Sequence, residues 1–169
     1  DFLSHSDFLF SFFEELRAEQ KSIDDIRGED IYAAFEDHLG LLEQLFLQYK
    51  MELERLGVYD FISVDRWIVN TPYLKNFDEI VIESMGLFTA FELSILSEAA
   101  AVVPLKLIFT LDEYNRKMAK KFQSVGVDIG DARGRLHIDL GAKKLVSTDD
   151  ISVSHTTIGA YRLKNRAYE

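Results

Sequence analysis

The chain has 169 residues and no cysteine. This absence excludes a scaffold held by disulfides and any metal site built from thiolates, and it fits a cytoplasmic protein. The four histidines, His5, His38, His137 and His155, are scattered, and no two have the spacing of a metal-binding pair. We therefore expect neither a metal ion nor a cofactor in this chain.

Long apolar runs are also missing, because the longest hydrophobic stretches have the length of one strand. A membrane-spanning helix needs about 20 mostly apolar residues, so we expect no contact with a membrane and see no signal-peptide pattern. The sequence has no phosphate loop of the form GxxxxGK[ST] and no GxSxG nucleophile elbow. The chain therefore cannot cradle a triphosphate by itself in the usual way.

Positive charge is scarce. The 19 lysines and arginines face 29 aspartates and glutamates, which gives a formal net charge of −10 and a pI near 4.9. The phosphate backbone of DNA repels such a chain as a whole, and we interpret the acidity mainly as a soluble surface. With 47% hydrophobic residues, the chain can form one domain with a sizeable core.

The stretch 77–111 organises the rest of the chain. The β-branched run at 80–82 predicts a short buried strand, and the apolar residues at 105–109 predict a second one. Between them, Thr89 and Glu92 have the spacing of a capping box that starts a helix. A strand, a helix and a strand with links this short predict a βαβ unit with a right-handed parallel crossover, so the fold class is α/β.

Residues 1–57 predict two helices. The first has an apolar face within 8–16, and the second extends over about 30–56 and ends before a glycine. The second helix carries apolar side chains at intervals of four and three residues, a heptad stripe made of Phe35, Leu39, Leu42, Phe46, Tyr49, Leu53 and Leu56. Because so regular a stripe needs a partner, we expect an antiparallel helical hairpin in which Leu42 and Phe46 are buried.

Residues 58–169 predict the remainder of the α/β part. Residues 133–140 alternate between apolar and polar side chains before Gly141 and Ala142, which predicts a β-hairpin near 135–147. The other expected elements are a short helix or strand within 58–76, a helix after Leu111, and strands at 151–154 and 158–163. The chain thus divides into a helical segment, 1–57, and an α/β core fragment, 58–169.

One candidate site lies at the end of the first expected strand. Glu83 is followed by Ser84 at the place where α/β folds bind their ligands. A carboxylate there can hold a magnesium ion or orient a water molecule. The alternative is that Glu83 only caps the turn or faces solvent, since no second acid stands beside it.

A second candidate is the only cluster of positive charge in the sequence. It consists of Arg116, Lys117, Lys120 and Lys121. Such a run is either one solvated face of a helix or a surface that contacts phosphate groups.

Three segments of the sequence carry a resemblance to a known family. They are HSDFLFSFFEELR at 5–17 with the long helix after it, FDEIVIESMGLFTAFELSIL at 77–96, and IGAYRLKNRAYE at 158–169. They resemble, in this order, the helical insertion, the strand and helix of the form DxIxLxGxxxxTxFExxxL, and the entry into the second helicase half of AddB-type subunits of bacterial PD-(D/E)XK helicase–nucleases. The resemblance covers most of the chain. It implies a 1B-like helical insertion followed by a fragment of a P-loop-NTPase-like parallel sheet.

The resemblance has one informative departure. Active helicases of this class have an Asp-Glu pair in their second motif, where this chain has Glu83 and Ser84. The resemblance therefore implies a degenerate motor, and no residue here matches the family's nuclease centre. We expect no activity from this segment alone, although its parent protein would be an ATP-dependent nuclease or helicase.

Two functions follow as hypotheses. The first is an internal helicase-like module of a DNA double-strand-break repair and recombination nuclease, which positions DNA and an AddA-like partner subunit. The second is a stand-alone interaction domain whose heptad helix recruits another protein, without nucleic acid. Because the chain starts without methionine directly before a helix, we expect it to be a segment of a longer protein.

Overall fold

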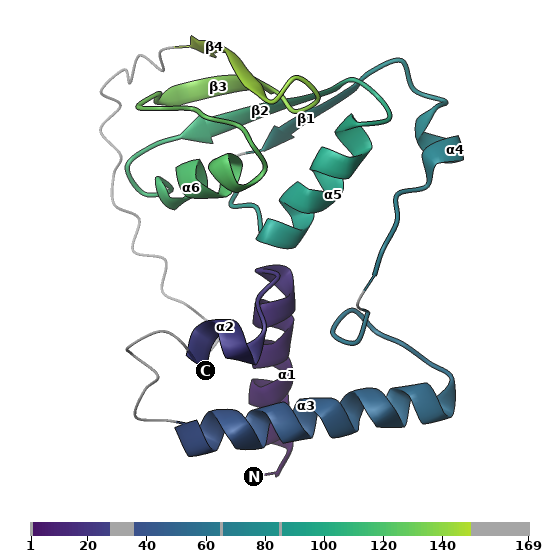
Figure 1. Cartoon of the computed structure of the whole chain (residues 1–169). Coiled ribbons are helices and arrows are strands. Elements are labelled where there is room, and N and C mark those ends of the chain that lie inside the picture. Colours follow the sequence, from purple (N-terminus) through teal and green to yellow (C-terminus); the bar gives the residue numbers. More distant parts are fainter. Residues whose placement is uncertain (1, 28–35, 65, 85, 150–169) are drawn as a thin grey trace, which may run out of the picture.

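The computed structural model describes residues 2–27, 36–64, 66–84 and 86–149. It is a mixed α/β structure that contains one four-stranded mixed sheet and several helices. Figure 1 shows the sheet at one end of the molecule and a group of helices at the other.

The sheet has the strand order β1-β2-β3-β4. Strands β1 (Ile80–Ser84) and β2 (Leu105–Leu111) are parallel, with helix α5 (Ala90–Ala100) between them in the chain. This confirms the predicted parallel strand–helix–strand unit. Strand β3 (Gly134–Asp139) pairs antiparallel with β2 and with β4 (Lys144–Asp149), which confirms the predicted hairpin.

Helix α5 begins with the capping box that the sequence predicts. The Thr89 hydroxyl accepts a hydrogen bond from the backbone N–H of Glu92, with 3.2 Å between Oγ1 and N. In return, the Glu92 carboxylate accepts the backbone N–H of Thr89 at 2.8 Å. Two backbone donors at the helix start are thereby satisfied.

One face of the sheet forms the main core. Along β2, the side chains alternate strictly, and Leu105, Leu107 and Phe109 are buried while Lys106 points to the other face. Helices α5 and α6 (Lys117–Ser124) cover the buried face (Figure 1). The other residues buried in this core from the covering helices and the adjoining strand are Leu93, Ala99, Ala100, Met118, Phe122, Leu136 and Ile138.

Helices α1 (Phe2–Ala18), α2 (Ile23–Arg27) and α3 (Glu36–Leu56) form the second part. The predicted antiparallel hairpin is wrong, because α1 crosses α3 steeply and does not lie along it (Figure 1). The reason is α2, a short helix for which the sequence predicts no element; it buries Ile23 and Ile26 in the same cluster as both longer helices.

Aromatic side chains fill the crossing of α1 and α3. The rings of Phe13 and Phe46 stack with centroids 5.0 Å apart, and Phe10 meets Tyr49 edge to face at 5.3 Å. Among the described side chains of the heptad stripe, only Leu39 is fully buried, while Leu42 and Phe46 are half-buried. The prediction that these two are buried is wrong in degree, because two crossing helices cover a shorter length of stripe than two parallel ones.

The remaining predicted elements lie within 58–76, at the start of the long helix and after residue 150. The region 58–76 contains a short helix, α4 (Thr71–Leu74), which starts with Asn70 as its cap and Pro72 in its first turn. Phe35, the start of the long helix, and the strands expected at 151–154 and 158–163 lie outside the described residues. Within the described part, no helix has the length and apolar character needed to cross a bilayer.

The end of α1 joins the two parts. The Arg17 guanidinium lies over the ring of Phe91 on α5, with 5.7 Å between the guanidinium carbon and the ring centroid. In the same interface, Gln20 Nε2 donates a hydrogen bond to the Ser94 hydroxyl on α5 at 2.8 Å. Lys121 of α6 completes the junction from a second helix, as described below.

Candidate functional site

The structure places Glu83 beside a cation. The Arg135 guanidinium on β3 donates a hydrogen bond to the Glu83 carboxylate, with 2.7 Å between Nη2 and Oε1. The pair lies on the sheet face that α5 and α6 do not cover. Because Glu83 is on β1 and Arg135 is on β3, their side chains meet across the intervening strand β2. Its carboxylate and guanidinium remain 60% and 42% exposed, so water screens their attraction.

Ser84 acts in the turn that follows β1. Its hydroxyl accepts the backbone N–H of Gly86, with 3.2 Å between Oγ and N. The described ranges contain no group of three or more His, Asp or Glu side chains that could hold a metal ion, and Glu83 is therefore not part of one.

The open face of the sheet carries one further ion pair and one contact between a histidine and a carboxylate. Lys106 Nζ lies 2.6 Å from Glu79 Oε1, and His137 Nε2 lies 2.8 Å from Asp149 Oδ2. The hydrogen bond with Glu79 raises the pKa of Lys106 above its usual value. A shallow hollow of about 210 Å³ lies beside these residues. The arrangement suits a solvated sheet face.

The basic cluster is divided by the helix that carries it. Met118 and Phe122 of α6 point into the core, and Lys121 lies at the edge of that buried face. Lys121 Nζ donates to Glu19 Oε1 at 2.5 Å and to the Phe88 carbonyl oxygen at 3.0 Å. This side chain, 22% exposed, ties α6 to α1 and is engaged within the fold.

The other three members of the cluster face solvent. Arg116, Lys117 and Lys120 are exposed, and within the described residues they make no ion pair. They form a small positive surface at the start of α6, on a molecule that is acidic as a whole. Of the four candidates for phosphate contact, these three have side chains that a phosphate can reach.

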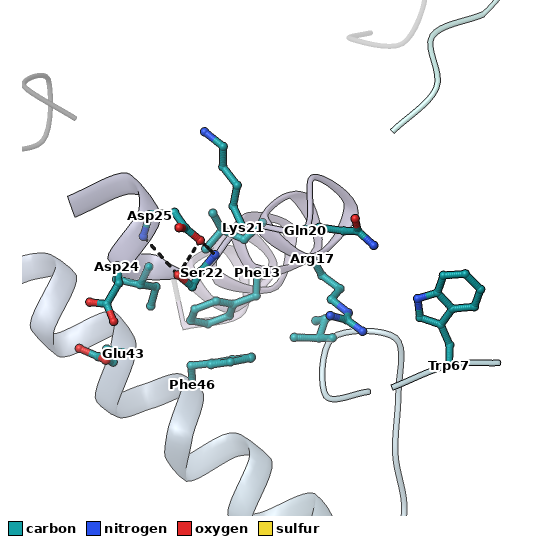
Figure 2. A pocket seen from close by; sticks show the side chains of 13 residues that line it. Phe13, Arg17, Gln20, Lys21, Ser22, Asp24, Asp25, Glu43, Phe46 and Trp67 are labelled. Atoms are coloured by element: carbon teal, nitrogen blue, oxygen red, sulfur yellow. Dashed lines mark hydrogen bonds between the residues drawn. The ribbon is translucent and has the colours of Figure 1, made fainter. Parts of the chain in front are cut away.

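A cavity lies between the helical part and the loop before α4. Its volume is about 470 Å³, and Figure 2 shows side chains entering it from α1, α2, α3 and the loop. Phe13, Phe46 and Ile62 supply apolar walls. Trp67 lies at one end and packs edge to face on Phe91, with ring centroids 5.7 Å apart. Sequence reasoning missed this cavity because α2 and the loop, which complete it, carry no recognisable motif.

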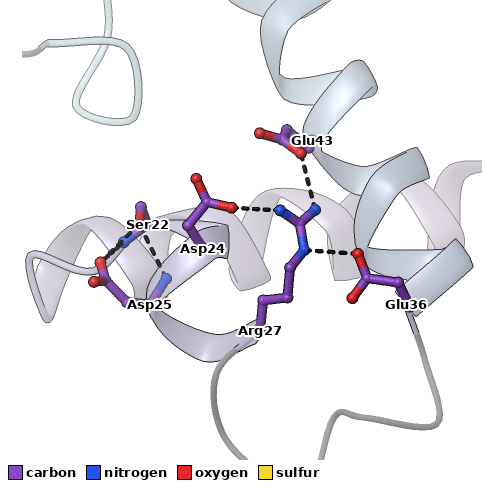
Figure 3. A network of polar contacts seen from close by, with 6 residues as sticks. All are labelled: Ser22, Asp24, Asp25, Arg27, Glu36 and Glu43. Atoms are coloured by element: carbon purple, nitrogen blue, oxygen red, sulfur yellow. Dashed lines mark hydrogen bonds and ion pairs between the residues drawn. The ribbon is translucent and has the colours of Figure 1, made fainter.

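Acidic side chains at the α2 end of the cavity are paired. Arg27 binds the carboxylates of Asp24, Glu36 and Glu43, with 2.9 Å from Nε to Glu36 and 3.0 Å from Nη2 to Glu43 (Figure 3). The hydrogen bond with Glu43 is the main cause of a raised pKa of Arg27. Asp25 accepts the backbone N–H and the hydroxyl of Ser22, which lowers the pKa of this carboxyl.

Arg17 lies near the other end of the cavity. Figure 2 shows its side chain extending from α1 toward Trp67. Its Nε is buried and has no hydrogen-bond acceptor among the described residues, and its contact with Phe91 is through the ring face. A planar guanidinium with unused donors is the group that proteins use to bind carboxylates and phosphates.

Comparison with protein-family models, with curated proteins and with solved structures returned no match to this chain.

Proposed function

We propose that the chain is an internal helicase-like module of an AddB-type DNA double-strand-break repair and recombination nuclease. In this proposal the module acts in the cytoplasm, positions DNA and an AddA-like partner subunit, and does not hydrolyse ATP itself. The observation that carries the proposal is the attachment of the helical part to the strand–helix–strand unit. Arg17, Glu19 and Gln20 at the end of α1 contact α5 and α6.

This attachment matters because a positioning module must hold its parts at a fixed distance. The three contacts join residues that are far apart in the chain, and the one between Glu19 and Lys121 spans 102 positions. These contacts fix the helical part to the helices that cover the sheet. A part that is fixed in this way can guide a bound DNA strand or a partner subunit without a chemical step.

The pairing of Glu83 supports a module without a motor activity. A catalytic carboxylate of a nucleotide-hydrolysing site binds magnesium or orients water, and it needs a phosphate loop nearby. Glu83 is instead paired with Arg135 on an open sheet face, and the sequence contains no phosphate loop. These two observations favour a structural use of the fold.

The surface of α3 supports a partner protein. Leu41, Leu45, Leu47 and Met51 lie outside the contact with α1 and are 56%, 39%, 59% and 60% exposed. Exposed apolar side chains gathered on one helix mark an interaction surface. The same observation favours the second candidate function, a stand-alone interaction domain that recruits a protein through α3.

DNA binding by the whole protein that carries this chain separates the two candidates. We expect Lys117→Glu combined with Lys120→Glu to weaken binding to double-stranded DNA and to make it less dependent on salt. The slope of the logarithm of the binding constant against the logarithm of the salt concentration becomes less steep by about 0.9 for each phosphate contact that is lost. The matched control is Lys75→Glu with Lys144→Glu, which changes the charge equally at exposed positions outside α6.

The titrations are run at two salt concentrations. Identical curves for the α6 variant, the control and the wild type would remove the reason for linking this chain to DNA. In that case, loss of a co-purifying subunit with Leu41→Glu and Leu45→Glu would favour the interaction domain.

A further inference from the structure

The cavity of about 470 Å³ between α1, α2, α3 and the loop before α4 combines apolar walls with an arginine, Arg17, whose Nε has no hydrogen-bond acceptor among the described residues. Its volume lies within the range of small-molecule and side-chain pockets, about 300–1,000 Å³. Phe13 and Phe46 stack against each other in its wall, and Ile62 adds a further apolar surface. Such walls favour an aromatic or aliphatic group.

The charged groups around the cavity are not equivalent. Asp24 and Glu43 are held by Arg27, and Asp25 is held by Ser22. Arg17, by contrast, lies over the face of the Phe91 ring, and its buried Nε has no acceptor among the residues that the structure describes. A buried donor without an acceptor costs free energy, which an incoming acceptor removes.

We propose that this cavity binds a carboxylate attached to an apolar group, with the Arg17 guanidinium holding the carboxylate and the Phe13, Phe46 and Ile62 side chains surrounding the apolar part. This chemistry occurs in small free acids and at the C-terminus of a peptide that ends in an apolar residue. The proposal is independent of the helicase-like function.

The acids around the cavity select against a more highly charged ligand. Asp24, Asp25 and Glu43 all line it, and a phosphate with nearly two negative charges meets more repulsion from them than a carboxylate with one. A single carboxylate also matches the planar donor pair of one arginine. The cavity is therefore suited to a monocarboxylate.

The position of Trp67 provides a direct measurement. It is the only tryptophan in the chain, and it lines the cavity. Its fluorescence therefore reports on the cavity without a label. We would titrate the full chain with 4-phenylbutyrate and with the matched neutral compound 4-phenylbutanamide, and confirm binding by calorimetry.

We expect the acid to bind roughly ten- to a hundredfold more tightly than the amide, the usual difference for a hydrogen bond to a charged group. In Arg17→Gln this preference should disappear, whereas it should persist in Arg55→Gln, where the replaced arginine lies on the exposed surface of α3. The comparison of acid and amide in the wild type needs no variant, so the test stands even if Arg17→Gln folds poorly.

Two peptides identify the source of the carboxylate. Acetyl-Gly-Gly-Phe with a free C-terminus should bind more tightly than 4-phenylbutyrate if the natural ligand is a peptide end, and its amidated form should lose that advantage. Tighter binding of 4-phenylbutyrate assigns the cavity to a small free acid. Equal affinity of acid and amide for the wild type, or no binding of either, would overturn the proposal.

Discussion

Tyr49 of α3 donates a hydrogen bond to the Asp60 carboxylate and thereby fastens the loop after α3 to that helix. Asp60 Oδ1 also accepts the backbone N–H of Ser63 at 2.8 Å. Burial raises the pKa of Tyr49 to about 12, and the bond to Asp60 adds to the shift. For Asp60, burial alone favours the neutral acid, but the hydrogen bonds from Tyr49 and Ser63 outweigh it and lower the pKa of the carboxyl.

The first prediction concerns pH. The lowered pKa of Asp60 stabilises the fold above the ordinary value of 3.8, and this contribution is lost as the pH falls through the folded-state pKa. The raised pKa of Tyr49 stabilises the fold below pH 10, and this contribution is lost as the pH rises toward 12. Tyr49→Phe should abolish the loss of stability at high pH and reduce the loss of stability at low pH. At pH 7 it should lower the free energy of unfolding by about 1–2 kcal/mol, since the pair is partly exposed.

Urea unfolding between pH 3 and pH 11 measures these effects. Tyr59→Phe is the control, because Tyr59 is 83% exposed. If Tyr49→Phe and the wild type had parallel pH profiles, the hydrogen bond to Asp60 would not contribute to stability.

The second prediction concerns the cluster of helices. Leu39 is 3% exposed, so Leu39→Ala should lower the free energy of unfolding by about 2–5 kcal/mol. Leu41→Ala, two positions away and 56% exposed, should change it by less than about 0.5 kcal/mol. Phe46→Ala should fall between them, since its ring is half-buried against Phe13. Equal losses for Leu39→Ala and Leu41→Ala in denaturant unfolding would contradict this packing.

The third prediction concerns the start of α5. Thr89→Ala removes the acceptor for the N–H of Glu92, and it should cost about 0.5–2 kcal/mol. Glu92→Ala should cost a similar amount, because it leaves the N–H of Thr89 without its partner. Glu98→Ala, in the last turn of the same helix, is the matched control and should not destabilise, since a carboxylate at a helix C-terminus is unfavourable. Thermal unfolding of the three variants decides between these outcomes.

The fourth prediction concerns catalysis. The isolated chain should neither hydrolyse ATP nor cut DNA in the presence of magnesium, because Glu83 is paired with Arg135 and no phosphate loop is present. Glu83→Gln should change stability by less than about 1 kcal/mol, as expected for an exposed ion pair. Turnover that persists through purification and disappears in Glu83→Gln would show that the carboxylate is catalytic.

The fifth prediction concerns the junction of the two parts. Lys121→Met removes the bonds to Glu19 and to the Phe88 carbonyl, so the end of α1 should exchange its amide hydrogens faster. Lys120→Met, the neighbouring exposed position, should leave that exchange unchanged. Hydrogen exchange followed by mass spectrometry compares the two. Equal protection of α1 in both variants would mean that Lys121 does not hold the junction.

The parts of the fold that the sequence could predict depend on neighbours in the chain. Thr89 and Glu92 are three residues apart, and the alternation in β2 and β3 is visible without knowledge of the rest of the fold. The crossing of α1 and α3 could not be predicted, because it depends on Ile23 and Ile26 in a segment that otherwise looks polar.

The candidate site shows the same limit. Glu83 could be found from its place at the end of a strand, but its partner Arg135 follows 52 positions later and depends on the order of strands in the sheet. Lys121 looked equivalent to Lys120 in the sequence. Only the packing of α6 shows that one of these lysines reaches Glu19 while the other faces solvent.

The contact between Glu19 and Lys121 also affects the order of events during synthesis. At about 5–20 residues per second, roughly 5–20 s pass between the addition of these two residues to the growing chain. Throughout that interval the end of α1 lacks its contact with α6, whereas the apolar partners of Phe13 all lie within residues 9–62 and are already present. The helical part can therefore pack before the sheet is complete, and only its junction with the sheet waits for α6.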